Sequence, residues 1–166
     1  MSELRVVVMG VSGCGKTTVG IALAERLGAR FIEGDRLHPE ANVAKMRAGI
    51  PLDDADRWPW LDAVASALAN GGPTVASCSA LKRNYRDRLR TRSGVPLHFV
   101  HLAGDRASLV QRMSERPGHY MPVSLLDSQL ATLEPPSAEE ALTLAIDMPV
   151  ETMVATALAA FKRGLS

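Results

Sequence analysis

The sequence is poor in cysteine and lacks long hydrophobic runs. It holds 2 cysteines and 4 histidines among 166 residues, and none of them has the spacing of a zinc site or a CxxC motif. We expect a reduced, cytoplasmic protein for that reason. The apolar part of the first ten residues is too short for a signal peptide. No run approaches the roughly 18 apolar residues that a membrane span needs, so we expect no membrane partner.

An excess of charge of one sign is also missing. There are 19 Lys and Arg residues against 18 Asp and Glu residues, a net charge of +1, which gives no general attraction to nucleic acid. The basic stretch LKRNYRDRLRTR, residues 81–92, is compatible with a solvated helix face or with an RNA-backbone patch. Aromatic residues make up only 4% of the chain, which leaves few side chains on which nucleic-acid bases could stack. We therefore expect no nucleic-acid partner.

Short apolar runs alternate along the chain with segments of helical periodicity. The composition, 46% hydrophobic and 22% charged, is that of a globular protein, and the length fits a single domain over residues 1–166. We expect strands at residues 4–10, 29–35, 73–80, 95–104 and 141–147. We expect helices at residues 16–28, 38–49, 54–72, 81–94, 105–116 and 150–164. A further helix should resume after the break at residues 117–124 and run to about residue 133. The alternation predicts an α/β fold with a parallel sheet covered on both faces, and ligands beyond the carboxyl ends of the strands.

The segment GVSGCGKT, residues 10–17, matches the phosphate-binding pattern G-x-x-x-x-G-K-[ST] between a strand and a helix. Backbone N–H groups of such a loop surround phosphate oxygens. Lys16 is expected to reach the β- and γ-phosphates of ATP, and the Thr17 hydroxyl to bind Mg²⁺. Cys14 is compatible with a redox-sensitive thiol or with a small residue that fits the loop. The predicted nucleotide-binding residues are Gly10, Val11, Ser12, Gly13, Cys14, Gly15, Lys16, Thr17 and Thr18.

A phosphate-binding loop serves kinases and also nucleotide-gated switches or binding modules. A guanine-reading N-K-x-D segment is absent from the sequence. The charged segment FIEGDRLHPEANVAKM, residues 31–46, follows the second predicted strand, where an acceptor pocket would lie. Asp35 is suited to accept the proton of an acceptor hydroxyl, and Glu33 to order the Mg²⁺ shell through water. Both are also compatible with helix capping or with a solvated loop.

Three further blocks resemble the gluconate kinase family of small P-loop kinases, which is related to shikimate and nucleoside-monophosphate kinases. They are EGDRLHPEANVAKMRAGIPLDDADRWPWL (33–61), CSALKRNYRDRLR (78–90) and ERPGHYMPVSLLDSQLATLE (115–134). The resemblance implies phosphorylation of D-gluconate with ATP and Mg²⁺, and a homodimer. We expect a three-layer P-loop NTPase fold whose five parallel strands have the order 2-3-1-4-5. Three features depart from the family pattern, namely Cys14, the longer side chain of Glu33, and the pair His119–Tyr120.

Gluconate is a carboxylate with a polyol tail, so arginine or lysine should bind one end and Asp, His or Asn the other. Lys82 and Arg86 are four residues apart and are expected to share a helix face. The carboxylate partner stays open among Arg57, Arg83 and Arg86. Trp58 and Trp60 are expected to pack. The predicted substrate-binding residues are Asp35, His38, Lys45, Arg57, Lys82, Arg83 and Arg86.

A lid is expected at about residues 112–123. Arg112 and Arg116 are four positions apart and would close over the transferring phosphoryl group. The break at Pro117 and Gly118 would let the lid pivot; two surface arginines on an ordinary loop are the alternative. His98 and His101 alternate with apolar residues on a strand and are expected to be structural. The rival functions are a kinase for shikimate or another sugar acid, and a binding module without transfer.

Overall fold

A computed structural model describes residues 4–115 and 123–163 of the chain. Its centre is a five-stranded sheet with the order β2-β3-β1-β4-β5, and every neighbouring pair of strands is parallel. The predicted fold class and strand order are therefore confirmed. The strands are β1 (Arg5–Met9), β2 (Arg30–Glu33), β3 (Thr74–Ser77), β4 (His98–Ala103) and β5 (Ala141–Ala145).

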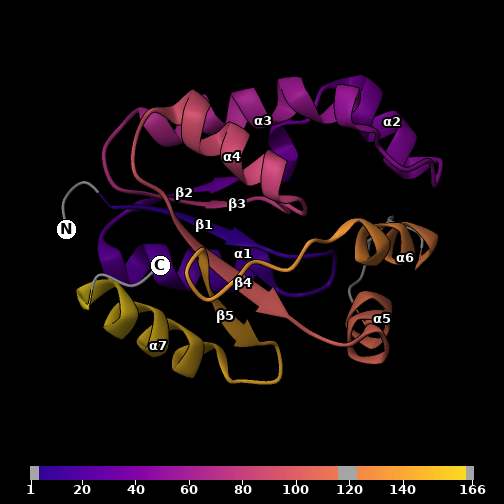
Figure 1. Ribbon diagram of the computed structural model, residues 1–166. Helices are drawn as coiled ribbons and strands as arrows, with labels where there is room; N and C mark the ends of the chain where they lie inside the picture. Colours follow the sequence, from indigo (N-terminus) through magenta and orange to yellow (C-terminus); the bar gives the residue numbers. More distant parts are fainter. Residues whose placement is uncertain (1–3, 116–122, 164–166) are drawn as a thin grey trace.

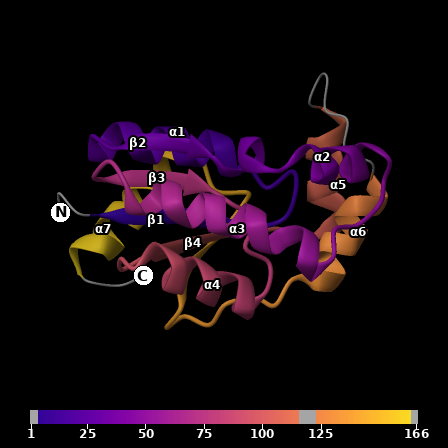
Figure 2. The ribbon, with the colours of Figure 1, turned by 90° about the horizontal axis from the view of Figure 1, so that it is seen from above.

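Helices cover both faces of the sheet, as Figure 1 shows. α1 and α7 lie on one face, and α3 and α4 on the other. α2, α5 and α6 gather at the end where the strands terminate (Figure 2). None of the helices in the described ranges is long and apolar enough to cross a membrane. The helices are α1 (Lys16–Leu27), α2 (Glu40–Arg47), α3 (Asp54–Ala69), α4 (Arg83–Ser93), α5 (Arg106–Ser114), α6 (Val123–Thr132) and α7 (Val150–Lys162).

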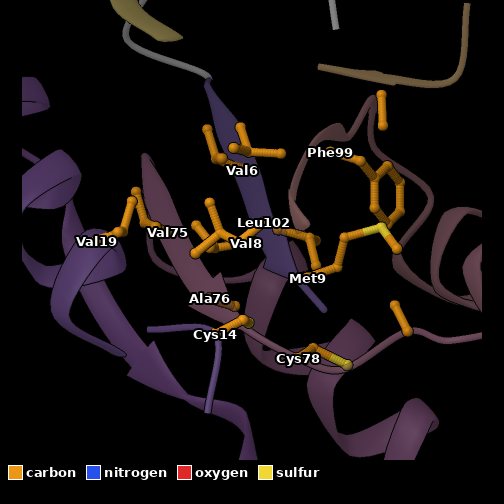
Figure 3. Close-up of a cluster of buried hydrophobic side chains, with 14 of the residues drawn as sticks. Val6, Val8, Met9, Cys14, Val19, Val75, Ala76, Cys78, Phe99 and Leu102 are labelled. Carbon is orange, nitrogen blue, oxygen red and sulfur yellow. The ribbon is translucent and has the colours of Figure 1, made fainter. Parts of the chain in front are cut away.

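The core lies between these layers and is built around β1. All five residues of β1 are buried, as expected for a central strand of a parallel sheet covered on both faces. Side chains such as Val8 and Leu102 meet there (Figure 3). Cys14 and Cys78 are part of this cluster and both are free thiols. Burial raises the pKa of Cys78 to about 12, so this thiol is unreactive at neutral pH.

The end of β2 differs from the sequence prediction. The expected strand over residues 29–35 stops at Glu33, and Gly34–Leu37 form a 3₁₀ turn. The cause is a close approach of Gly34 to β3, since a Cβ on Gly34 would lie 2.0 Å from the carbonyl oxygen of Ser77. The Gly34 amide donates to Ser77 Oγ at 3.2 Å, and the Gly34 carbonyl accepts the indole N–H of Trp60 at 2.8 Å. Gly34 is thereby fixed from two sides.

The start of α4 also differs from the prediction. The helix begins at Arg83, and Lys82 is the extended residue before it, with φ −106° and ψ 153°. The predicted helix began at residue 81 and placed Lys82 and Arg86 on one face. That placement is wrong, because Lys82 is the N-cap residue of α4: its carbonyl accepts the Arg86 N–H at 3.1 Å, but its extended backbone does not place its side chain on the helical face of Arg86.

The contact at Gly34 yields a stability prediction. Gly34→Ala should lower the free energy of unfolding by more than about 2 kcal/mol, because the methyl group meets backbone that cannot rotate away. Gly94→Ala is the matched control. Gly94 has φ +69° and no atom within 4 Å of the position that a Cβ would take, so that change should cost only about 1 kcal/mol for the left-handed conformation. Urea unfolding measures both values. Equal costs for the two variants would contradict this role of Gly34.

Candidate active site

The loop between β1 and α1 has the shape of a phosphate-binding loop. Gly10, Gly13 and Gly15 have φ of 145°, 83° and 94°, a region of backbone conformation that favours glycine. α5 packs against this loop. A Cβ on Gly13 would lie 3.1 Å from the Leu109 carbonyl oxygen, and one on Gly15 would lie 3.7 Å from Nη1 of Arg112. The glycines therefore allow the loop to turn tightly beneath α5 and leave its backbone open to a ligand.

Thr17 and Glu33, the predicted Mg²⁺ residues, lie together. Thr17 Oγ1 donates a hydrogen bond to Glu33 Oε2 at 2.6 Å, and Ser77 Oγ donates to Glu33 Oε1 at 2.6 Å. The longer side chain of Glu33 thus spans the gap to the loop. Thr17 gives its proton to Glu33 and keeps its oxygen lone pairs available. Hydroxyl and carboxylate oxygens are donors of the kind that Mg²⁺ prefers, so these residues fit the ion.

A cleft of about 540 Å³, part of it open to solvent, lies between this loop and the segments that follow β2 and β3. Lys16 and Ser12 of the loop line it together with Asp35, His38 and Arg57. The phosphate loop and the predicted acceptor residues therefore share one cavity. The other lining residues are Met46, Pro51, Leu52, Trp60, Ser79, Leu81, Leu125, Ser128 and Gln129.

Asp35 is placed by the 3₁₀ turn, one residue after Gly34. It is exposed to the cleft. Its carboxylate makes no hydrogen bond or ion pair with the part of the chain that the structure describes. Lys16, whose Nζ donates to the Val11 carbonyl at 3.0 Å, lines the same cleft. A free carboxylate in the same cleft as the lysine of the predicted phosphate-binding loop is suited to orient a hydroxyl and to take its proton.

His38 stacks on Trp60, with ring centroids 4.1 Å apart and an interplanar angle of 17°. Burial lowers the pKa of His38 to about 4; nearby Asp35 raises it and Arg57 lowers it, and burial is the largest of the three effects. The imidazole is therefore neutral at physiological pH. Trp60 is 1% exposed, which confirms the packing prediction, and it also forms part of the cleft wall.

Arg57 reaches the cleft from α3 and is 8% exposed. Its Nη1 donates to the hydroxyl of Tyr85 at 2.7 Å, and that hydroxyl in turn donates to Asp54. Burial and the bond to Asp54 raise the pKa of Tyr85 to about 12, so the hydroxyl keeps its proton. Within the described ranges Tyr85 is the one hydrogen-bond partner of this guanidinium, which leaves N–H donors available for an anion in the cleft.

Arg86 does not line the cleft, although the sequence predicts it as a substrate-binding residue. It is 1% exposed, and its Nε donates to Glu140 Oε2 at 2.8 Å. Its terminal nitrogens donate to the carbonyls of Ala80 at 2.8 Å and Glu134 at 3.0 Å. Burial alone would raise the pKa of Glu140, but hydrogen bonds from Arg86 and Arg90 outweigh it and lower that pKa. Arg86 therefore holds α4 to the segment before β5.

Three other predicted substrate residues also lie outside the cleft lining. Lys45 pairs with Asp56 at 2.7 Å. Lys82 lies 3.7 Å from Asp54, and Arg83 is exposed and lies 3.4 Å from Asp87. These acidic partners hold the three cations in ion pairs at the surface.

Arg112 lies on α5 beside the phosphate loop. Its Nη2 donates to the Ile146 carbonyl at 2.5 Å, and its other terminal nitrogen lies over Gly15. Arg116, Pro117, Gly118, His119 and Tyr120 lie outside the described residues. The pairing of Arg112 with Arg116 and the lid hinge therefore stay predictions.

The sequence reasoning missed the contribution of α6. Gln129 Oε1 accepts the backbone N–H of Ser12 at 2.8 Å, which joins α6 to the phosphate loop, and Ser128 lines the cleft beside it. Both residues lie within the quoted block 115–134, but they carry no charge that would draw attention to them.

Cys14 is 1% exposed and lies 3.9 Å from Lys16 Nζ, which favours the interpretation as a small residue that fits the loop.

Comparison with known proteins places the chain in a family. A family model described as an AAA domain matches residues 6–136. A gluconokinase of Gluconobacter oxydans is 54% identical over 138 residues, which are 81% of this chain and 77% of that protein. The chain belongs to the gluconokinase family. The thermosensitive gluconokinase of Escherichia coli is 48% identical over 147 residues, covering 86% of this chain and 78% of the other.

A solved gluconokinase structure has the same fold over nearly the whole chain. The gluconokinase of Sinorhizobium meliloti is 51% identical, with a TM-score of 0.89 over 98% of this chain and 94% of that one. The match covers 98% of this chain, so it extends far beyond the phosphate-binding loop.

The neutral state of His38 predicts a loss of stability in acid. The unfolded chain binds a proton near the ordinary pKa of 6.5 and the folded chain only near about 4. Between these values the unfolded state carries the extra proton, so stability falls as pH falls. Wild type should lose about 2 kcal/mol more than His38→Gln between about pH 7 and about pH 5. Denaturant unfolding at both pH values measures the difference, and an equal loss in the two proteins would contradict a buried neutral His38.

Proposed function

We propose that this protein transfers the γ-phosphoryl group of ATP to the terminal hydroxyl of D-gluconate and forms ADP and 6-phospho-D-gluconate. One observation carries the proposal. The phosphate loop, represented by Lys16, and the acceptor residues Asp35, His38 and Arg57 line the same cleft. Membership of the gluconokinase family supports the choice of acceptor.

The nucleotide side consists of the loop amides, Lys16 and the residues that fit Mg²⁺. Residues 10–18 would surround the phosphates, with Lys16 reaching the β- and γ-phosphates. Thr17 and Glu33 would hold the ion directly or through water; when bound, Mg²⁺ neutralises charge on the phosphate oxygens. Arg112 lies over the loop at Gly15 and would stabilise the charge of the transferring group, together with Arg116.

One arginine on the acceptor side of the cleft is the partner of the gluconate carboxylate. Of the three candidates, Arg86 is held by Glu140 and backbone carbonyls, and Arg83 is exposed beside Asp87. Arg57 lines the cleft and is held in place by Tyr85. Arg57 therefore binds the carboxylate, at the end of the substrate away from the reacting hydroxyl.

Asp35 acts at the other end of the acceptor. The oxygen of the terminal hydroxyl attacks the γ-phosphorus, and the bond from that phosphorus to the β–γ bridging oxygen breaks as ADP leaves. The hydroxyl proton passes to the Asp35 carboxylate. Exclusion of water during this step matters because water competes with the sugar hydroxyl as a nucleophile.

We place the enzyme in the cytoplasm as a homodimer.

The test is ADP formation with MgATP and a panel of acceptors. The panel contains D-gluconate, shikimate, other aldonates, D-glucitol as the uncharged analogue, and no acceptor. D-gluconate should give the fastest release, and Asp35→Asn should lower kcat by at least about 100-fold through the lost proton acceptor. Asp87→Asn, at an exposed carboxylate on α4, is the matched control and should keep its activity.

Each other outcome has a definite meaning. Faster release with a different acceptor would overturn gluconate and keep the kinase. Tight ATP binding without acceptor-dependent release would overturn the kinase in favour of a binding module. Full activity in Asp35→Asn would overturn the assigned role of this carboxylate.

A further inference from the structure

Asn42 on α2 is a buried polar residue that contacts the cleft residue His38. Its side chain is almost completely enclosed, at 3% exposure. Its Nδ2 lies 2.9 Å from the backbone carbonyl of Asp56 and 3.1 Å from Nδ1 of His38. A backbone carbonyl only accepts hydrogen bonds. The group that faces it is therefore the NH₂ end of the carboxamide, and the orientation of Asn42 is fixed.

This orientation determines where the imidazole proton lies. The two hydrogens of Asn42 Nδ2 point to the Asp56 carbonyl and to His38 Nδ1. Nδ1 must then accept and carries no proton. A neutral imidazole has a single N–H, and burial keeps His38 neutral by lowering its pKa to about 4. The proton consequently lies on Nε2.

The opposite edge of the ring is available to a ligand. Stacking on Trp60 fixes the plane of the imidazole, and Trp60 is itself fixed by its bond to the Gly34 carbonyl. Nε2 has no protein acceptor within residues 4–115 and 123–163, and it is not among the buried unpaired atoms of those residues. His38 lines the cleft that also contains Asp35 and Arg57.

We propose that Asn42 is a positioning residue that holds His38 as an Nε2–H donor to an oxygen atom of the sugar-acid acceptor. This inference rests on the proposed function and deepens it. His38 then recognises the acceptor and takes no proton from it, because Nε2 already carries one. Proton acceptance falls to Asp35, the neighbouring free carboxylate, so the two side chains have separate roles.

The first test reads the tautomer directly. Protein with ¹⁵N-labelled histidine is examined by long-range ¹H–¹⁵N NMR near pH 7, without ligand, and the His38 signals are assigned by their loss in His38→Gln. We expect an unprotonated Nδ1 and a protonated Nε2, and a larger shift of Nε2 than of Nδ1 on addition of D-gluconate. A proton on Nδ1, or a doubly protonated ring, would overturn the proposal, as would the absence of any Nε2 shift at saturating D-gluconate.

The second test separates positioning from general stability. Asn42→Asp replaces the donor by a carboxylate that accepts from Nδ1–H, and Asn42→Ala removes it. Loss of one hydrogen bond to the acceptor should raise KM for D-gluconate about tenfold in both variants, with KM for ATP within about twofold of wild type. In Asn42→Asp the NMR signature should show a proton on Nδ1. Asn70→Asp, at an exposed asparagine bonded to the Ser66 carbonyl, is the matched control. It should change neither KM for D-gluconate nor the position of the His38 proton.

Circular dichroism shows whether the two Asn42 variants fold. If both fold and KM for D-gluconate is unchanged in both, the positioning role is overturned. If the variants do not fold, the wild-type NMR spectrum alone decides the tautomer. If wild type does not turn over D-gluconate, the proposed function fails, and the ligand-free spectrum still decides whether Asn42 locks His38.

Discussion

The contact between Gly34 and β3 is the constraint on which the site depends. The chain leaves β2 so close to Ser77 that no side chain fits, with 2.0 Å between a Cβ at Gly34 and the Ser77 carbonyl oxygen. Glu33, one residue before, is held by the hydroxyls of Thr17 and Ser77. Asp35, one residue after, enters the cleft. A single fixed glycine thus directs one carboxylate to the phosphate loop and the next into the cleft.

The surroundings of each charged side chain, rather than its type, decide its role. Arg57 and Arg86 are both buried, yet Arg86 is held by Glu140 and backbone carbonyls, whereas Arg57 has a neutral tyrosine hydroxyl as its partner. A buried charge needs compensation. The protein itself compensates the charge of Arg86 through Glu140. A substrate carboxylate would compensate the charge of Arg57. The same reasoning separates Asp35, which is free, from Asp54 and Asp56, which are paired with Tyr85 and Lys45.

Sequence reasoning reached the sheet order and the nucleotide loop because their signals are local. A buried β-branched run before G-x-x-x-x-G-K-[ST] specifies strand, loop and helix together. The ion pairs of Lys45 and Arg86 give no local signal, since Lys45 and Asp56 are 11 positions apart and Arg86 and Glu140 are 54 positions apart. The start of α4 at Arg83 was likewise set by tertiary contacts, with the Arg83 amide donating to Glu134 at 2.9 Å. Gln129 was missed because an uncharged side chain on a helix gives no sign of a backbone amide that it will meet.

The central claim is that phosphate loop and acceptor residues form one site that joins a phosphoryl group to the terminal hydroxyl of D-gluconate. The most direct measurement is ³¹P NMR of the reaction of wild-type protein with MgATP and D-gluconate. The account predicts a phosphate monoester whose phosphorus couples to the two protons of C6, formed in equal amount with ADP. Release of inorganic phosphate with ADP, or a phosphate on another carbon, would contradict it.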